Sequence, residues 1–146
     1  MSALKAMLAA AAALLFATAA LGAEEAFWHR HAAAEPSLVL DHGRKWQTDA
    51  PLRQGMENIR AALSKGMTYE ALAAEVRSEV AGIVQSCRLE PAADAQLHVV
   101  LIQLLAGAEA MEGKVPGENR RDGAERIGKA LDAYGTHFDH EGWSDL

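Results

Sequence analysis

Cysteine, proline and aromatic residues are scarce in this sequence. Its 146 residues contain one Cys and four Pro, and 5% of them are aromatic. A single Cys excludes an intramolecular disulfide framework and any zinc or iron–sulfur site built from several cysteines. Basic residues are outnumbered 14 to 20 by acidic ones, and the formal net charge of −6 argues against a general nucleic-acid binder. Abundant Ala and Leu favour a helical protein.

The first 23 residues lack acidic side chains altogether. They carry one charged residue, Lys5, ahead of a long apolar run that ends in small residues, with cleavage expected after Gly22 or Ala23. This layout predicts a secretory signal peptide over residues 1–23, an oxidising periplasmic location and no stable membrane insertion after cleavage. An uncleaved membrane anchor is the alternative, because the run is nearly long enough to span a bilayer.

Residues 24–49 show no sustained helical period. They contain Pro36 and the turn-forming run Asp41-His42-Gly43. We therefore expect an extended leader that carries histidine and tryptophan side chains. No later stretch alternates as a strand does for more than a few residues.

From residue 50 onward, apolar residues recur at spacings of three and four. Such seams predict four helices, and short connections between them predict an antiparallel up-down-up-down four-helix bundle over residues 50–146. The seams are Leu52, Met56, Ile59 and Leu63; Tyr69, Leu72, Val76, Val80, Ile83 and Cys87; Leu97, Leu101, Leu104, Ala108 and Met111; and Ala124, Ile127, Leu131, Tyr134 and Phe138.

Residues with helix-start or helix-stop preferences lie at the ends of these seams. The predicted starts are Thr48 or Asp49 with Pro51, then Thr68, Pro91, and Asn119 with Asp122; the predicted stops include Gly66, Gly113 and Pro116-Gly117.

The predicted topology gathers the histidines at one end of the bundle. All six histidines and Cys87 fall at that end or on segments attached to it, together with Trp46 and Trp143. One interpretation is a ligand site. The other is that the tryptophans and the leader close an open bundle end while the histidines are solvated.

Imidazole groups at this end suit copper, nickel, zinc or haem iron. His29 and His31 lie two apart in the leader, and His137 and His140 lie three apart near the end of the last helix, so either pair can chelate one ion. His98 completes the candidate metal-ligand set.

The chain resembles the soluble four-helix-bundle cytochromes of the b-type and c-prime kind over roughly residues 50–141. The helix order carries the resemblance, together with Met56 in RQGMENIRAAL and His137 in AYGTHFDH. It implies haem b held between Met56 and His137, with His140 as a second choice. A CxxCH motif is missing, so the covalent haem of the c-prime proteins is excluded.

Three functions remain open from the sequence. The first is a periplasmic haem-binding electron carrier. The second is a periplasmic copper-, nickel- or zinc-binding protein, and the third is a structural or interaction module without a ligand. The first two imply a redox or metal-handling partner in the cell envelope. We do not expect an enzyme, because no Ser-His-Asp order, phosphate loop, HExxH or Glu-x-x-His pattern occurs.

Overall fold

The computed structural model describes residues 37–144, and their fold is all-α. The helices and two very short strands are, in chain order, β1 (Trp46–Gln47), α2 (Ala50–Ser64), α3 (Tyr69–Ser86), α4 (Pro91–Met111), α5 (Arg120–His137) and β2 (Phe138–Asp139). The predicted signal peptide at 1–23 and the first part of the predicted leader lie outside the described residues. The described part of the leader, 37–49, precedes the first described helix and is not helical.

The helix starts are where the sequence predicts them. The Asp49 side chain accepts a hydrogen bond from the Leu52 N–H at 3.0 Å, which makes Asp49 rather than Thr48 the N-cap of α2. Thr68 caps α3 in the same way. At α5, Asn119 and Asp122 satisfy each other's backbone N–H groups in a capping box. Side-chain capping thus fixes three of the four described helix starts.

The end of the last helix differs from the prediction. We expected the helix to run through Phe138, but α5 ends at His137 and Phe138 pairs with Trp46 in a parallel two-stranded ladder. Phe138 is nevertheless fully buried. A strand of two residues is too short to show alternation, which is why the sequence pattern did not indicate it.

The helices pack around one hydrophobic core. Its largest fully buried side chains are Tyr134, Phe138, Leu52, Met56, Ile59, Ile83, Leu97, Leu104, Met111, Ile127, Leu131 and Val76. All of them belong to the predicted seams. One seam residue, Tyr69, is not buried: it is 37% exposed, because it is the first residue of α3 and lies outside the buried stripe.

Glycines bring α4 and α5 into close contact. A Cβ atom built on Gly123 would lie 2.6 Å from the carbonyl oxygen of Gly107 and 2.7 Å from the Met111 nitrogen. Both are backbone atoms, which cannot move aside as a side chain can. Glycine at this position therefore sets the separation of the two helices.

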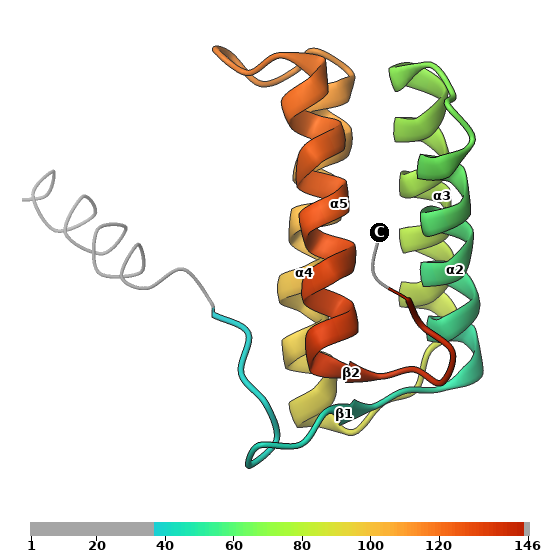
Figure 1. Ribbon diagram of the computed structural model, residues 1–146, viewed down its shortest axis with the longest axis vertical. Helices are drawn as coiled ribbons and strands as arrows, with labels where there is room; N and C mark the ends of the chain where they lie inside the picture. The colour runs from blue at the N-terminus through green and yellow to red at the C-terminus, as the bar shows by residue number, and fades with distance from the viewer. Residues whose placement is uncertain (1–36, 145–146) are drawn as a thin grey trace, which may run out of the picture. The chain divides into compact units, whose positions relative to one another are not determined.

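Hydrogen bonds connect segments that are far apart in the sequence. The Asp49 carboxylate accepts from the Arg88 N–H at 2.6 Å, and the Thr48 hydroxyl donates to the Asp139 carbonyl at 2.6 Å. The start of α2 therefore lies beside the end of α3 and beside β2. Figure 1 shows the four helices side by side, with β1 and β2 at the lower end of the view.

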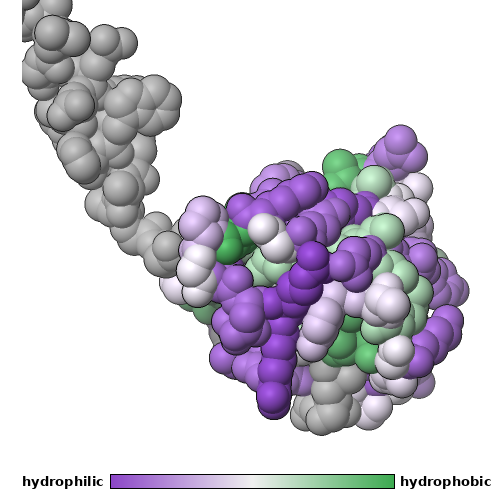
Figure 2. Space-filling view, turned by 90° about the horizontal axis from the view of Figure 1, so that it is seen from above, coloured by the Kyte–Doolittle hydropathy of each residue, from purple (hydrophilic) through white to green (hydrophobic). Residues whose placement is uncertain are grey.

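The upper end of that view carries the α2–α3 and α4–α5 connections. Figure 2 looks onto this end and shows mainly hydrophilic residues with smaller hydrophobic areas between them. Near it, the Arg77 guanidinium of α3 binds the Glu112 carboxylate at 2.9 Å. This hydrogen bond, with a second from Lys114, lowers the pKa of Glu112 from 4.5 to about 2.

No helix within residues 37–144 is both long enough and apolar enough to cross a bilayer.

Candidate functional site

Met56 lies inside the core. Its side chain is fully buried among the apolar residues that join the four helices. A haem ligand must face a slot that accepts the flat porphyrin. The thioether of Met56 is enclosed on all sides, so these residues do not fit haem unless the core opens. Haem binding through Met56 and His137 therefore stays a prediction that the packing does not favour.

His98 and Cys87, both predicted at the histidine-rich end of the bundle, have different surroundings. His98 lies on α4 and is exposed to solvent. Cys87 follows α3 as its C-cap and is partly buried against the core. Burial raises the pKa of the Cys87 thiol, and the negative charges of Asp49 and Asp94 raise it further. Cys87 is therefore held in its neutral thiol form. His29 and His31 lie outside the described residues.

His137 is the last residue of α5 and is half-buried. Its Nδ1 lies 2.8 Å from the Ala133 carbonyl oxygen, one helical turn earlier. A carbonyl only accepts hydrogen bonds, so Nδ1 carries the ring proton and donates it. In a neutral ring this tautomer leaves Nε2 with a lone pair, the form in which a histidine binds a metal ion.

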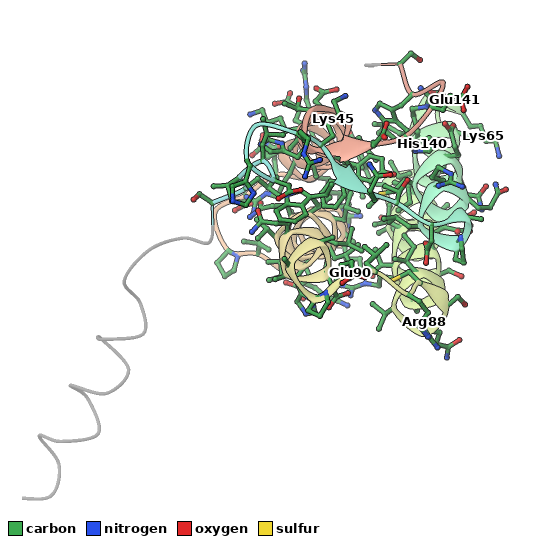
Figure 3. All side chains as sticks on the ribbon, turned by 90° about the horizontal axis from the view of Figure 1, so that it is seen from below. Lys45, Lys65, Arg88, Glu90, His140 and Glu141 are labelled. Carbon is green, nitrogen blue, oxygen red and sulfur yellow. The ribbon has the colours of Figure 1, made fainter. Side chains whose placement is uncertain are left out.

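His140 is almost completely enclosed. Its side chain is only 6% exposed, Nδ1 lies 3.0 Å from the Tyr134 hydroxyl, and Nε2 lies 3.6 Å from Oε1 of Glu57. It lies just after β2, on a segment that turns toward α2 (Figure 1). Figure 3 views this end from below and shows His140 next to α2. The chain reversal after α5 therefore brings an imidazole from the C-terminal segment against a carboxylate of α2.

Burial controls the protonation of this cluster. Desolvation lowers the pKa of His140, and the positive charges of Arg53 and Arg60 lower it further, while the Glu57 carboxylate acts in the opposite direction. Burial also raises the pKa of Tyr134. The imidazole is therefore neutral and the phenol protonated at neutral pH.

Trp143 covers the cluster. Its ring meets the Tyr134 ring edge-on at a centroid distance of 4.8 Å and lies 5.0 Å from the His140 ring. The Arg60 guanidinium lies 4.8 Å above the Trp143 ring and donates to the Ser144 carbonyl at 2.7 Å. These contacts hold the segment after β2 against both α2 and α5.

The arrangement brings together residues that the sequence did not single out. Glu57, Tyr134 and Arg60 were not among the predicted site residues, although Tyr134 was expected in the core. Glu57 and Arg60 form an ion pair at 3.0 Å. They are three residues apart in the sequence, which is typical of an ordinary ion pair on a helix surface. Only the fold shows that His140 lies beside them.

The predicted ligands do not form one compact set. Within residues 37–144, no three His, Cys, Asp or Glu side chains stand together in an arrangement that could hold a metal ion. Among the described residues, the one predicted ligand that lies within 4.0 Å of a carboxylate is His140, whose Nε2 is 3.6 Å from Oε1 of Glu57.

Sequence and structure comparisons supply no further assignment. No protein-family model, no curated protein and no solved structure matches this chain.

Proposed function

We propose that this chain is an exported helical-bundle protein that binds a metal ion at the end where α5 terminates. The observation that carries the proposal is the state of two imidazoles. His137 and His140 each have Nδ1 within hydrogen-bond distance of an oxygen atom, an arrangement that leaves Nε2 available to a metal ion when the ring proton is on Nδ1. Neutral imidazole nitrogen suits copper, nickel and zinc.

The proposal includes an antiparallel up-down-up-down bundle. Hydrogen bonds from Asp49 to Arg88 and from Thr48 to Asp139 support it, since they join the start of α2 to the ends of α3 and α5. A further hydrogen bond joins the Val39 N–H ahead of α2 to Gln96 near the start of α4. In this topology the histidines of α5 and of its C-terminal extension share one end with Cys87.

We favour an ion over haem. The enclosed Met56 supports this choice, because an ion needs no porphyrin slot. The signal-like residues 1–23 support a periplasmic location, where a metal-handling or redox partner of the cell envelope would deliver or receive the ion.

Calorimetric titration of the purified chain with Cu²⁺, Ni²⁺ and Zn²⁺ tests the proposal. We expect binding to at least one ion and a large loss of affinity in a His137→Ala/His140→Ala variant. The matched control is a His42→Ala variant, which removes an exposed histidine outside the candidate ligand set and should bind as the wild type does. Affinity should weaken below about pH 6, because protonated imidazole does not bind metals.

An absorption spectrum and an elemental analysis of protein purified from periplasm distinguish the alternatives. A Soret band that is lost in Met56→Ala would support the haem carrier. A wild-type protein that binds neither haem nor any of the three ions would contradict the proposal. The remaining function would then be the structural or interaction module without a ligand.

A further inference from the structure

We infer that His140 Nε2 and Glu57 Oε1 are two ligands of one divalent metal ion of the zinc or copper class. The inference deepens the proposed function and rests on it, since it names the atoms that begin the coordination sphere. It adds a carboxylate on α2 that no sequence pattern indicated.

The separation of the two atoms carries the inference. Nε2 and Oε1 lie 3.6 Å apart, which is too long for a hydrogen bond. Two atoms that each bind a tetrahedral ion at about 2.1 Å are separated by about 3.4 Å. The pair therefore has nearly the spacing of two neighbouring metal ligands, and a shift of a few tenths of an ångström would bring the two atoms to that spacing.

Both groups are already oriented by neighbours on the side away from the ion. When Nε2 binds a metal, the ring proton resides on Nδ1, and the Tyr134 hydroxyl oxygen at 3.0 Å accepts it. The Arg60 guanidinium donates to Oε2 of Glu57 at 3.0 Å, which leaves Oε1 for the ion. This is the outer-shell arrangement that fixes metal-binding histidines and carboxylates in other proteins.

Exposure indicates how an ion would enter. The His140 side chain is 6% exposed, whereas that of Glu57 is 35% exposed. An ion would approach from the Glu57 side, with water in the remaining coordination positions. The nearby positive charges of Arg53 and Arg60 oppose a cation, so the affinity of the pair should rise when one of these charges is removed.

Zn²⁺ titration of the purified chain and of single-site variants tests the pair. We expect Glu57→Gln and His140→Gln each to weaken Zn²⁺ binding by about tenfold or more. The control is Glu125→Gln, a carboxylate near the start of α5 that pairs with Arg121 at 3.2 Å, and its affinity should be unchanged. Arg53→Gln should bind Zn²⁺ more tightly than the wild type.

Nitrogen-15 spectra of the histidine side chains supply a second readout. Zn²⁺ should shift the Nε2 resonance of His140 while Nδ1 remains protonated. Glu57→Gln replaces a partly exposed group without changing its shape, so it keeps the test decisive if His140→Gln unfolds the segment.

The outcomes separate this inference from the proposed function. If the wild type binds Zn²⁺ and both variants bind it equally well, the pair is not the site, although the chain still binds metal elsewhere. If the wild type binds none of Cu²⁺, Ni²⁺ and Zn²⁺, both the proposed function and this inference fall.

Discussion

Asp49 serves two segments with one carboxylate. Oδ1 caps α2 through the Leu52 N–H, and Oδ2 accepts from the Arg88 N–H at 2.6 Å. Loss of a capping side chain costs about 1 kcal/mol, and Asp49→Ala also leaves a second N–H without its acceptor. We therefore expect Asp49→Ala to lower the free energy of unfolding by about 2 kcal/mol.

Urea unfolding followed by circular dichroism measures this loss. Thr68→Ala is the matched control, because the Thr68 side chain caps only its own helix, at 3.3 Å from the Ala71 nitrogen. Its loss should be about half as large. Equal losses in the two variants would show that the contact with Arg88 contributes nothing.

Cys87 should behave as an unreactive thiol. Burial and then the charges of Asp49 and Asp94 raise its pKa, and the thiolate is the form that reacts with alkylating reagents. We expect iodoacetamide to modify Cys87 more slowly at neutral pH than it modifies a small-molecule thiol, with a rate that is still rising above pH 9. Mass spectrometry follows the reaction. A rate that is already level at neutral pH would contradict the assignment.

At the scale of the elements, a Gly→Ala change should have opposite effects on the free energy of unfolding in α5 and in α3. Gly123→Ala in α5 places a methyl group 2.6 Å from the Gly107 carbonyl oxygen, so α4 and α5 must separate. Overpacking of this kind costs about 1–3 kcal/mol. Gly82→Ala in α3 meets no atom within 4 Å and should stabilise the protein by about 0.5–1 kcal/mol. Thermal unfolding of both variants measures the two changes, and a Gly123→Ala variant as stable as the wild type would show that the helices can move apart without loss.

The ion pair between Arg77 of α3 and Glu112, which follows the last residue of α4, should make stability depend on pH. Arg77 and Lys114 lower the pKa of Glu112 from 4.5 to about 2 in the folded chain. Between these two values the unfolded chain binds more protons than the folded one, so the contribution of Glu112 is complete above pH 4.5 and disappears as the pH falls toward 2.

Comparison of the wild type with Glu112→Gln across this pH range isolates the effect. The difference in their unfolding temperatures should be largest above pH 5 and should shrink on acidification. A difference that is constant with pH would contradict the role of the carboxylate charge.

Helix boundaries were predictable because they depend on neighbours in the sequence. Thr68 and Asn119 each cap a backbone N–H three residues ahead, and Pro91 begins α4 where its missing N–H is harmless. The parallel pairing of Trp46 with Phe138 was not predictable, because each strand has two residues and the partners are far apart in the chain.

At the scale of the whole molecule, Trp143 connects the C-terminal segment to two helices. It packs on Tyr134 of α5 and beneath Arg60 of α2. We expect Trp143→Ala to lower the free energy of unfolding by about 2–4 kcal/mol, with partial recovery in Trp143→Phe, which keeps an aromatic ring. Chemical denaturation measures both variants. Native-like stability of Trp143→Ala would show that the segment does not contribute to the fold.

The candidate site was only partly predictable, because its residues also come from distant parts of the chain. His137 and His140 were singled out from their spacing, but the spacing assumed a continuous helix. Because α5 ends at His137, the two side chains emerge from different backbone conformations. His140 instead meets Glu57, and no sequence period relates the two residues.

The pairing of β1 with β2 has a consequence for how such a chain would cross a membrane. Gln47 and Asp139 are 92 residues apart, and the two strands join the beginning and the end of the helical region. A chain that emerges from a translocation channel with its N-terminus first cannot make this contact until the last helix has passed through. If the chain is exported as proposed, the two strands would therefore pair only at the end of translocation, and most of the chain would cross before the fold is complete.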